Sequence, residues 1–258
     1  IKKDLLREEV SVGEAIIRVI EEAGIDMVFG MQGANTRYIF NALYDHRSTI
    51  RTVLVRHESL AGVMAEVYGR LTGKPGVCIG QGAFMLSNAL LGVLEAYLGS
   101  SPMLLLSDLS DGAPFSHHAP YQAGTGDYGT WNARQSFAGV TKLTFVPQQP
   151  VQAVQSTQLA IKHALSGNRG PVAVLYHSSA FTGLVGPNSV PKLYKTQQYL
   201  PDKPTGTNGE IIEDALQKIL AAKNPVIVAG NGVRIASAYD ELRHVAEMIG
   251  APVGTTVS

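Results

Sequence analysis

The chain has 258 residues, of which 45% are hydrophobic and 16% charged, and its 21 Lys and Arg residues balance 21 Asp and Glu residues. This composition is typical of a globular protein with a sizeable core and excludes a disordered chain. Nucleic-acid binders and polybasic membrane binders normally carry an excess of basic residues, so the zero formal charge argues against both. A single cysteine excludes an internal disulfide or a Cys-rich metal site. It favours a reducing, cytoplasmic location, and no apolar run is long enough to span a membrane.

Helical and strand patterns alternate along residues 1–181. Ser11 and Glu14 form a capping box at the start of the first helix, and Gly24 ends it. Such alternation predicts an α/β fold in three layers, with a parallel sheet covered by helices on both faces. We expect helices at 11–24, 34–45, 58–73, 86–98 and near 150–166, strands at 26–30, 51–57, 74–82, 102–108 and 171–177, and a long loop at 109–130.

Residues 182–206 are rich in Pro, Gly, Asn and Thr and predict a linker. Residues 207–258 then begin a second, Rossmann-like α/β domain with two helices and two strands. A stable open sheet generally has more strands than this. We therefore expect that the chain is a fragment, or that another chain completes the second domain.

Polar side chains and glycines follow several of the predicted strands. In an open parallel sheet, ligands bind at the carboxyl ends of the strands, so these residues are candidates for a site. They are Gln32 and Gly33 after the first strand, Glu58 after the second, Gln81 and Gly82 after the third, and His117, His118 and Gln122 in the loop after the fourth.

Simpler interpretations exist for each candidate. Glu58 can be a first-turn carboxylate stabilised by the helix dipole, and the glycines can belong to ordinary turns. Adjacent extended residues point to opposite sides, so His117 and His118 cannot both bind one metal. They are either solvated loop residues or imidazoles that act in an active site. The chain has no HExxH motif and no phosphate-binding P-loop, and its Gly230-Asn231-Gly232 segment is a weak match to a dinucleotide fingerprint, so we expect no metal ligands in this chain.

In order along the chain, four segments resemble the N-terminal half of thiamine-diphosphate (ThDP) enzymes of the acetolactate synthase and 2-oxo-acid decarboxylase type. They are FGMQGANTRYIFNAL, VRHESLAGVMAEVYGRLTGKPGVCIGQGAFMLSNALLGVLEAYLGSSPMLLLSD, GVTK and GNRGPVAVLYH. The resemblance runs from about Val10 to Ala180 and continues more loosely into the central domain. Its most specific part matches the pattern R-H-E-x-x-A, A-x-x-Y-A-R and G-x-P-G-V, with Gly69 in place of the usual alanine.

The resemblance implies that residues 1–181 are the PYR domain, which holds the aminopyrimidine ring of ThDP. Glu58 falls on the glutamate that hydrogen-bonds the pyrimidine N1′ and thereby promotes loss of the thiazolium C2 proton. The resulting ylid attacks a 2-oxo acid such as pyruvate, CO₂ leaves, and an enamine remains that can join a second carbonyl compound. The cofactor carries this chemistry, while the protein supplies binding, orientation and electrostatics.

Other positions carry over from the family with differences. Gln32 stands where synthases have Pro and several decarboxylases have His, beside the reacting centre, and a glutamine cannot titrate. Gln81 and Gly82 replace the turn S/T-G-P-G and bring an amide close to the pyrimidine. With Glu58, they are expected to contact the cofactor together with Gly33 and Asn88.

Two registers of the long loop are compatible with the family. In one, His117 and His118 correspond to the paired histidines of pyruvate decarboxylases. In the other, Gln122 falls near the active-site glutamine of the synthases. Both alternatives stay open at this point.

The family's diphosphate and metal motif, G-D-G followed by N-N, does not occur in this chain. In the family it lies on a PP domain, and the cofactor sits between the PYR domain of one subunit and the PP domain of another. The resemblance therefore implies that the Mg²⁺ and diphosphate ligands lie outside this chain, and that a PP-domain chain or a C-terminal half completes the site in a dimer or tetramer. The central domain of the family binds FAD in some members and no nucleotide in others.

Three functions follow from these patterns. The first is acetolactate-synthase-like carboligation of 2-oxo acids. The second is simple decarboxylation of a 2-oxo acid, or an acyl-CoA-directed lyase reaction. The third, from a different class, is a catalytically silent PYR-like scaffold, against which the presence of Glu58 argues.

Overall fold

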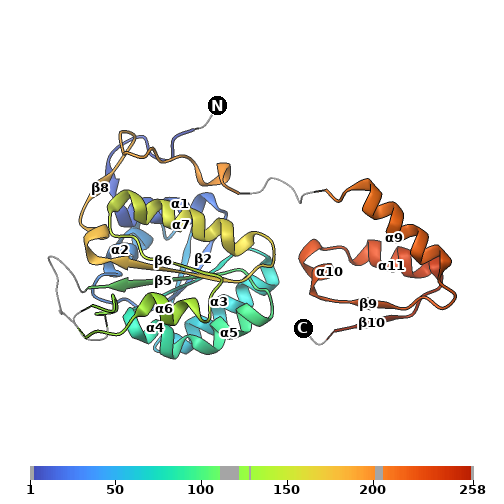
Figure 1. The fold of residues 1–258 in the computed structure, drawn as a ribbon. Helices are drawn as coiled ribbons and strands as arrows, with labels where there is room; N and C mark the ends of the chain where they lie inside the picture. Colours follow the sequence, from blue (N-terminus) through green and yellow to red (C-terminus); the bar gives the residue numbers. More distant parts are fainter. Residues whose placement is uncertain (1–2, 111–121, 128, 201–205, 257–258) are drawn as a thin grey trace. The chain divides into compact units, whose positions relative to one another are not determined.

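The computed structural model describes residues 3–110, 122–127, 129–200 and 206–256, and it divides into two compact units, Ile1–Pro201 and Asp202–Ser258. The first unit is built on a six-stranded sheet in the order β3-β2-β4-β5-β7-β6 (Figure 1). All neighbouring pairs in this sheet are parallel, as the sequence predicts. The strands are β2 (Met27–Gly30), β3 (Arg51–Leu54), β4 (Gly76–Ile79), β5 (Met103–Leu109), β6 (Leu143–Phe145) and β7 (Pro171–His177).

Helices cover both faces of this sheet and create two separate cores (Figure 1). Strands β5 and β7 are buried at every position, which is why their sequences are almost continuously apolar. The expected three-layer α/β fold is therefore confirmed. One face carries α1 (Val12–Glu22), α2 (Arg37–Asp45) and α7 (Pro150–Leu165), and the other carries α3 (Glu58–Thr72), α4 (Gly82–Asn88), α5 (Leu90–Leu98) and α6 (Ala133–Ala138).

Two predicted features differ in the structure. The single helix expected at 86–98 is two helices, α4 and α5, which meet at Ala89. Residues 182–200, expected as a linker, pack onto the first unit. The short strand β8 (Leu184–Val185) pairs antiparallel with β1 (Val10–Ser11). The side chain of Leu193 is buried as well, and the backbone N–H of Thr196, which begins the short 3₁₀ helix η1 (Thr196–Gln198), donates to Glu22 Oε2 at 2.8 Å.

The composition of this segment explains the difference. Pro, Gly and Asn mark irregular backbone, but an irregular segment can still bury isolated apolar side chains such as Val185 and Leu193. A short helix, α8 (Ser178–Phe181), directly precedes this segment.

The second unit contains α9 (Gly209–Ala221), β9 (Ile227–Ala229), α10 (Asn231–Ala236), α11 (Tyr239–Ile249) and β10 (Val253–Thr255). Its two strands pair in parallel, which agrees with the expected start of an α/β domain. None of the three helices has a buried residue. A two-stranded sheet with uncovered helices is marginally stable on its own.

Two searches of the described residues returned negative findings. No helix among them has both the length and the apolar character that a membrane crossing requires. No group of three or more His, Cys, Asp or Glu side chains in the same part of the chain is arranged to hold a metal ion.

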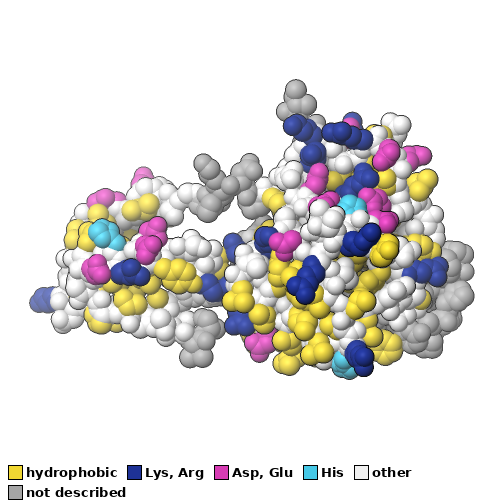
Figure 2. Space-filling view, turned by 180° about the vertical axis from the view of Figure 1, so that it is seen from behind, with side chains coloured by type: hydrophobic (Ala, Val, Ile, Leu, Met, Phe, Trp, Pro, Cys, Tyr) yellow, Lys and Arg dark blue, Asp and Glu magenta, His cyan; other side chains and the backbone are white. Residues whose placement is uncertain are grey.

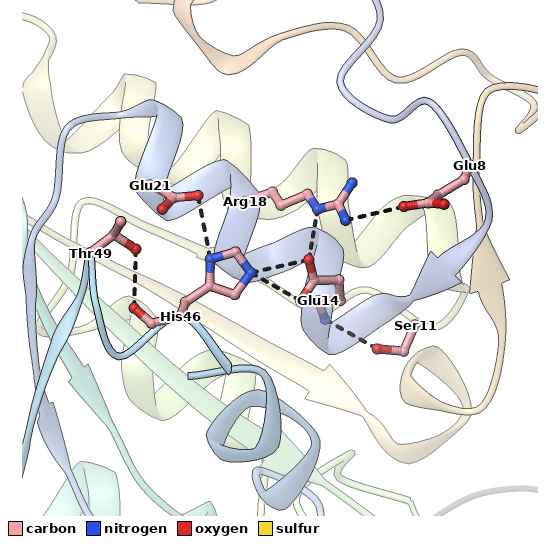
Figure 3. Close-up of polar contacts among 7 residues, drawn as sticks. All are labelled: Glu8, Ser11, Glu14, Arg18, Glu21, His46 and Thr49. Atoms are coloured by element: carbon pink, nitrogen blue, oxygen red, sulfur yellow. Dashed lines mark hydrogen bonds and ion pairs between the residues drawn. The ribbon is translucent and has the colours of Figure 1, made fainter. Parts of the chain in front are cut away.

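A polar cluster fastens α1 to the C-terminal end of α2 (Figure 3). The imidazole Nε2 of His46 lies 3.1 Å from both carboxylate oxygens of Glu14, and its Nδ1 lies 3.4 Å from Glu21 Oε2. The Nε of Arg18 donates to Glu14 Oε1 at 2.7 Å. Burial tends to raise the pKa of Glu14, but the hydrogen bonds and charges of His46 and Arg18 outweigh it and hold the pKa below the usual range.

This depressed pKa predicts how the cluster contributes to stability as the pH changes. A carboxyl with a lowered folded-state pKa stabilises the protein above its unfolded pKa of 4.5, and the contribution is lost as the pH falls through the folded value. We expect Glu14→Gln to lower the unfolding free energy by about 1 kcal/mol at pH 6, since the site is partly exposed. Urea unfolding from pH 3 to 7 checks this, and a difference that grows towards acid pH would contradict it.

Candidate active site

The carboxyl ends of β2 and β4 mark a topological switch in the sheet. From β2 the chain moves outward to β3, whereas from β4 it moves the other way to β5. Ligands of open α/β sheets bind in the crevice at such a point. Gly33, after β2, and Gln81, after β4, meet there, since a Cβ added to Gly33 would lie 2.7 Å from the Cβ of Gln81. Gly33 therefore allows the two strand-end turns to approach.

Glu58 is the first residue of α3 and follows the edge strand β3. Its N-terminal neighbour His57 caps the helix, with Nδ1 accepting from the backbone N–H of Ser59 at 3.4 Å. Glu58 is only 7% exposed, and the side-chain amide of Asn88 donates to its Oε2 at 2.8 Å. Within the described residues, its Oε1 has no hydrogen-bond partner. The helix start therefore holds a nearly buried carboxyl group with one oxygen fixed by Asn88 and the other without a hydrogen-bond partner among the described residues.

The turn after β4 brings Glu58 and Gly82 to the same edge. The Cγ of Glu58 is 3.5 Å from the position that a Cβ at Gly80 would occupy. Gly82 begins α4 with φ +43°, in the left-handed region that favours glycine. Its backbone N–H donates to Asp108 Oδ1 at 3.0 Å. Gly82 thus connects the end of β4 to the end of β5.

Asp108 is a site residue that the sequence analysis did not single out. It lies in β5 and is completely buried. Besides the Gly82 N–H, its carboxylate accepts a short hydrogen bond from Nε2 of Gln122. Burial raises the pKa of Asp108 above its usual range, although hydrogen bonds from Gly82, Gln122 and Asn35 oppose that rise. The available signal was a charged residue near the end of the otherwise apolar strand segment PMLLLSD.

Gln122 is anchored at this edge by both its side chain and its backbone. It is 3% exposed, its side-chain amide pairs with Asp108, and its backbone carbonyl accepts from Ser110 N at 3.0 Å. His117 and His118 lie outside the residues that the structure describes. The register that places these two histidines in the active site therefore stays a prediction.

Gln32 takes a different place from the other candidates. It is exposed and lines a groove between α2 and β3. The structure therefore forms one group from Glu58 and Asn88 and a second from Gly82, Asp108 and Gln122. Gln81 lies between the turns, against Gly33.

Sequence comparisons identify the family to which this chain belongs. The model described as the N-terminal TPP binding domain of thiamine pyrophosphate enzymes matches residues 10–124, and the model for their central domain matches residues 212–258. The chain belongs to the thiamine pyrophosphate enzymes. It carries the N-terminal domain of such an enzyme and part of the central domain. The resemblance seen in the sequence motifs is thereby confirmed.

Three curated relatives illustrate the range of the family. Two are acetolactate synthase large subunits. The subunit from Corynebacterium glutamicum is 33% identical over 97% of this chain and 38% of its own length, and isozyme 3 from Escherichia coli is 31% identical over 95% and 41%. A probable 2-ketoarginine decarboxylase from Pseudomonas aeruginosa is 28% identical over 98% and 43%. The chain therefore spans about two fifths of the length of these relatives.

The described residues fit the cofactor that the family name implies. A ring nitrogen of ThDP needs a carboxyl partner in a water-poor place, and Glu58 offers a nearly buried carboxylate whose Oε1 has no hydrogen-bond partner among the described residues. Asn88 holds the other oxygen and so fixes the direction of the carboxylate.

Proposed function

We propose that this chain is the pyrimidine-binding part of a ThDP-dependent enzyme that acts on 2-oxo acids, with acetolactate-synthase-like carboligation as its reaction. The observation that supports it is the buried Glu58 carboxylate at the topological switch point, fixed on one side by Asn88. When bound, ThDP supplies the carbanion chemistry that splits and joins bonds next to a carbonyl. The chain spans about two fifths of the length of its curated relatives, so this proposal assigns it one part of such an enzyme.

The protein's own residues have separate roles in this proposal. Glu58 holds or shares a proton at the pyrimidine ring, and Asn88 keeps its carboxylate aimed there. Gln81 borders the ring with its amide. Asp108 and Gln122 fix the turn at Gly82, which follows β4. The diphosphate and Mg²⁺ are assigned to a PP domain of a partner or of a longer chain.

An exposed apolar surface on α3 and α5 suits such a partner. Hydrophobic side chains gather on one face of the first unit (Figure 2), and exposed apolar side chains that lie together can mark an interface. We propose that a second subunit covers it and that the enzyme is at least a dimer. The exposed side chains are Leu60, Val63, Met64 and Leu71 on α3 and Leu91, Leu94, Tyr97 and Leu98 on α5.

A charge placed on this surface tests the proposed interface. Leu98 is 74% exposed, so Leu98→Lys is expected to leave the subunit folded and to weaken self-association about tenfold or more, because the charge would be buried without a partner. Analytical ultracentrifugation of the complete enzyme measures the effect. Val190→Lys, at a residue that is 88% exposed elsewhere on the first unit, is the matched control and should associate normally.

Decarboxylation without carboligation is the second candidate. The similarity to a probable 2-ketoarginine decarboxylase supports it, whereas Gln32, which cannot titrate, gives no acid for protonating an intermediate. The two reactions consume the same class of substrate, so the products distinguish them.

Turnover of 2-oxo acids tests the proposed function. The chain is titrated with ThDP and Mg²⁺ alone and as part of an assembly that includes a PP domain, and loss of pyruvate and of 2-ketoarginine is followed together with CO₂ release and product identity. We expect activity only in the assembly, with a C–C coupled product. Aldehyde as the sole product would favour the decarboxylase. Cofactor binding without turnover of any 2-oxo acid would overturn both, and would leave the scaffold.

A further inference from the structure

A groove between α2 and the edge strand β3 is separate from the Glu58 group. Its volume is about 750 Å³, within the range of small-molecule sites. Phe40 and Leu54 form its accessible apolar lining, over the buried side chains of Leu43 and Ile50. Residues with polar groups lie on both walls beside the apolar ones, which suits a molecule with an apolar body and a polar end. They are Gln32, Asn41, Tyr44, Arg47, Arg51 and Thr52.

The charge of the lining is unbalanced. Two of the lining residues are Arg47 and Arg51, and none of the lining residues that the structure describes is Asp or Glu. The chain as a whole has a formal charge of zero, so this local excess is not a consequence of overall composition. Arginine is the preferred partner of carboxylate and phosphate groups because its donors match their geometry.

Arg47 is held in place by its own neighbour. Its Cζ lies 4.4 Å from the centre of the Tyr44 ring, and its Nη1 donates to the Tyr44 carbonyl at 2.7 Å. A guanidinium has five N–H donors, so four remain for a ligand. A cation that is already oriented loses less conformational entropy when it binds an anion.

Thr52 provides an independent sign of a missing partner. Its hydroxyl oxygen is buried and has no hydrogen-bond partner within the described residues, and the residue lines the groove. Buried hydroxyls are nearly always hydrogen-bonded, so an unsatisfied one beside a cavity points to a ligand group that completes it.

We propose that the α2–β3 groove binds a small organic anion, with its carboxylate or phosphate held by Arg47 and Arg51 and its apolar body lying on the accessible side chains of Phe40 and Leu54. The Thr52 hydroxyl donates to the bound anion or accepts from a polar group of its body. The proposal does not depend on Glu58 or on ThDP. Gln32, which follows β2 and precedes Gly33, lines one end of the groove.

Binding of three matched probes to the full 258-residue chain tests the proposal. The probes are 4-phenylbutyrate, the neutral 4-phenylbutanol, and inorganic phosphate, and binding is followed by calorimetry and by amide chemical shifts. We expect 4-phenylbutyrate to bind at least about tenfold more tightly than the alcohol, because the charge-assisted hydrogen bonds are lost. Shifts should concentrate at Tyr44, Arg51 and Thr52. Phosphate that binds as tightly as 4-phenylbutyrate would show that the apolar body contributes nothing and would overturn the organic ligand.

Three variants separate the groove from general effects. Arg51→Gln should weaken 4-phenylbutyrate binding about tenfold, whereas Arg7→Gln, an exposed arginine outside the groove with the same charge change, should not. Thr52→Val should weaken binding while the stability of the free protein stays equal or rises, because an unpaired buried hydroxyl is removed. Loss of binding in that variant therefore cannot come from unfolding. Equal binding by the wild type and Arg51→Gln, or shifts confined to other surfaces, would overturn the proposal.

Discussion

Glu58→Gln is expected to slow exchange of the C2 proton of bound ThDP by about 100-fold or more in the complete enzyme, and to leave the fold unchanged. Glutamine has nearly the same shape and can still accept from Asn88, but it cannot share or transfer a proton, and general acid–base groups typically contribute factors of this size. Hydrogen–deuterium exchange at C2, quenched in acid and read by NMR, measures the effect directly. It reports proton transfer at the cofactor without requiring that the natural substrate be known.

A second buried carboxylate on the same helix is the matched control. Glu66 is 5% exposed, lies 3.1 Å from Arg70 Nε and accepts from Ser101 at 2.9 Å. Glu66→Gln removes a buried charge from α3 as Glu58→Gln does, so it should reduce stability but leave C2 exchange near the wild-type rate. Exchange that is equally slow in both variants, or nearly normal in Glu58→Gln, would contradict the role assigned to Glu58.

The sequence predicts the main elements of the first unit because burial imposes a clear period on them. The helix expected at 58–73 is α3 at Glu58–Thr72, and the strand expected at 171–177 is β7. The break at Ala89 is not visible, because apolar residues continue at helical spacing across it. Strand β6 has only three residues and is partly exposed, so it has no apolar run that distinguishes it from a loop.

Some residues of the candidate site can also be predicted from the sequence, and others cannot. Glu58 and Gly82 can be found from their position after strands, since strand ends form the binding edge of an open sheet. The hydrogen bond between Asp108 and Gln122 cannot be predicted in this way. The two residues are 14 positions apart, and the sequence between them has no hydrophobic period. The expected place of Gln32 beside the reacting centre stays a prediction. The sequence did not indicate that Gln32 also lines the groove between α2 and β3, because that groove depends on how the two elements are arranged in space.

Replacement of Asp108 is expected to have the largest effect on the stability of the first unit. Asp108→Leu leaves the Gly82 N–H and the Gln122 amide buried without their acceptor, and each unsatisfied donor costs about 1–3 kcal/mol, so about 2–6 kcal/mol is expected in total. Asp108→Asn retains one acceptor oxygen and should lose less. Urea unfolding followed by the fluorescence of Trp131, the only tryptophan, reports this unit. Asp26→Asn, at an exposed ion pair with Lys74, should cost less than about 1 kcal/mol.

The pH dependence of the unfolding free energy shows whether the ionisation of Asp108 contributes to stability or whether only its packing does. Because burial raises the folded-state pKa of Asp108 above its unfolded value of 3.8, the folded protein binds more protons than the unfolded chain between these two values. The wild type should therefore lose stability relative to Asp108→Asn as the pH rises through this window and keep a constant difference above it. This sign is opposite to that of Glu14, whose contribution grows with pH. A wild-type advantage over Asp108→Asn that instead increases from pH 4 upwards would show that hydrogen bonds hold Asp108 ionised and that burial does not dominate its titration.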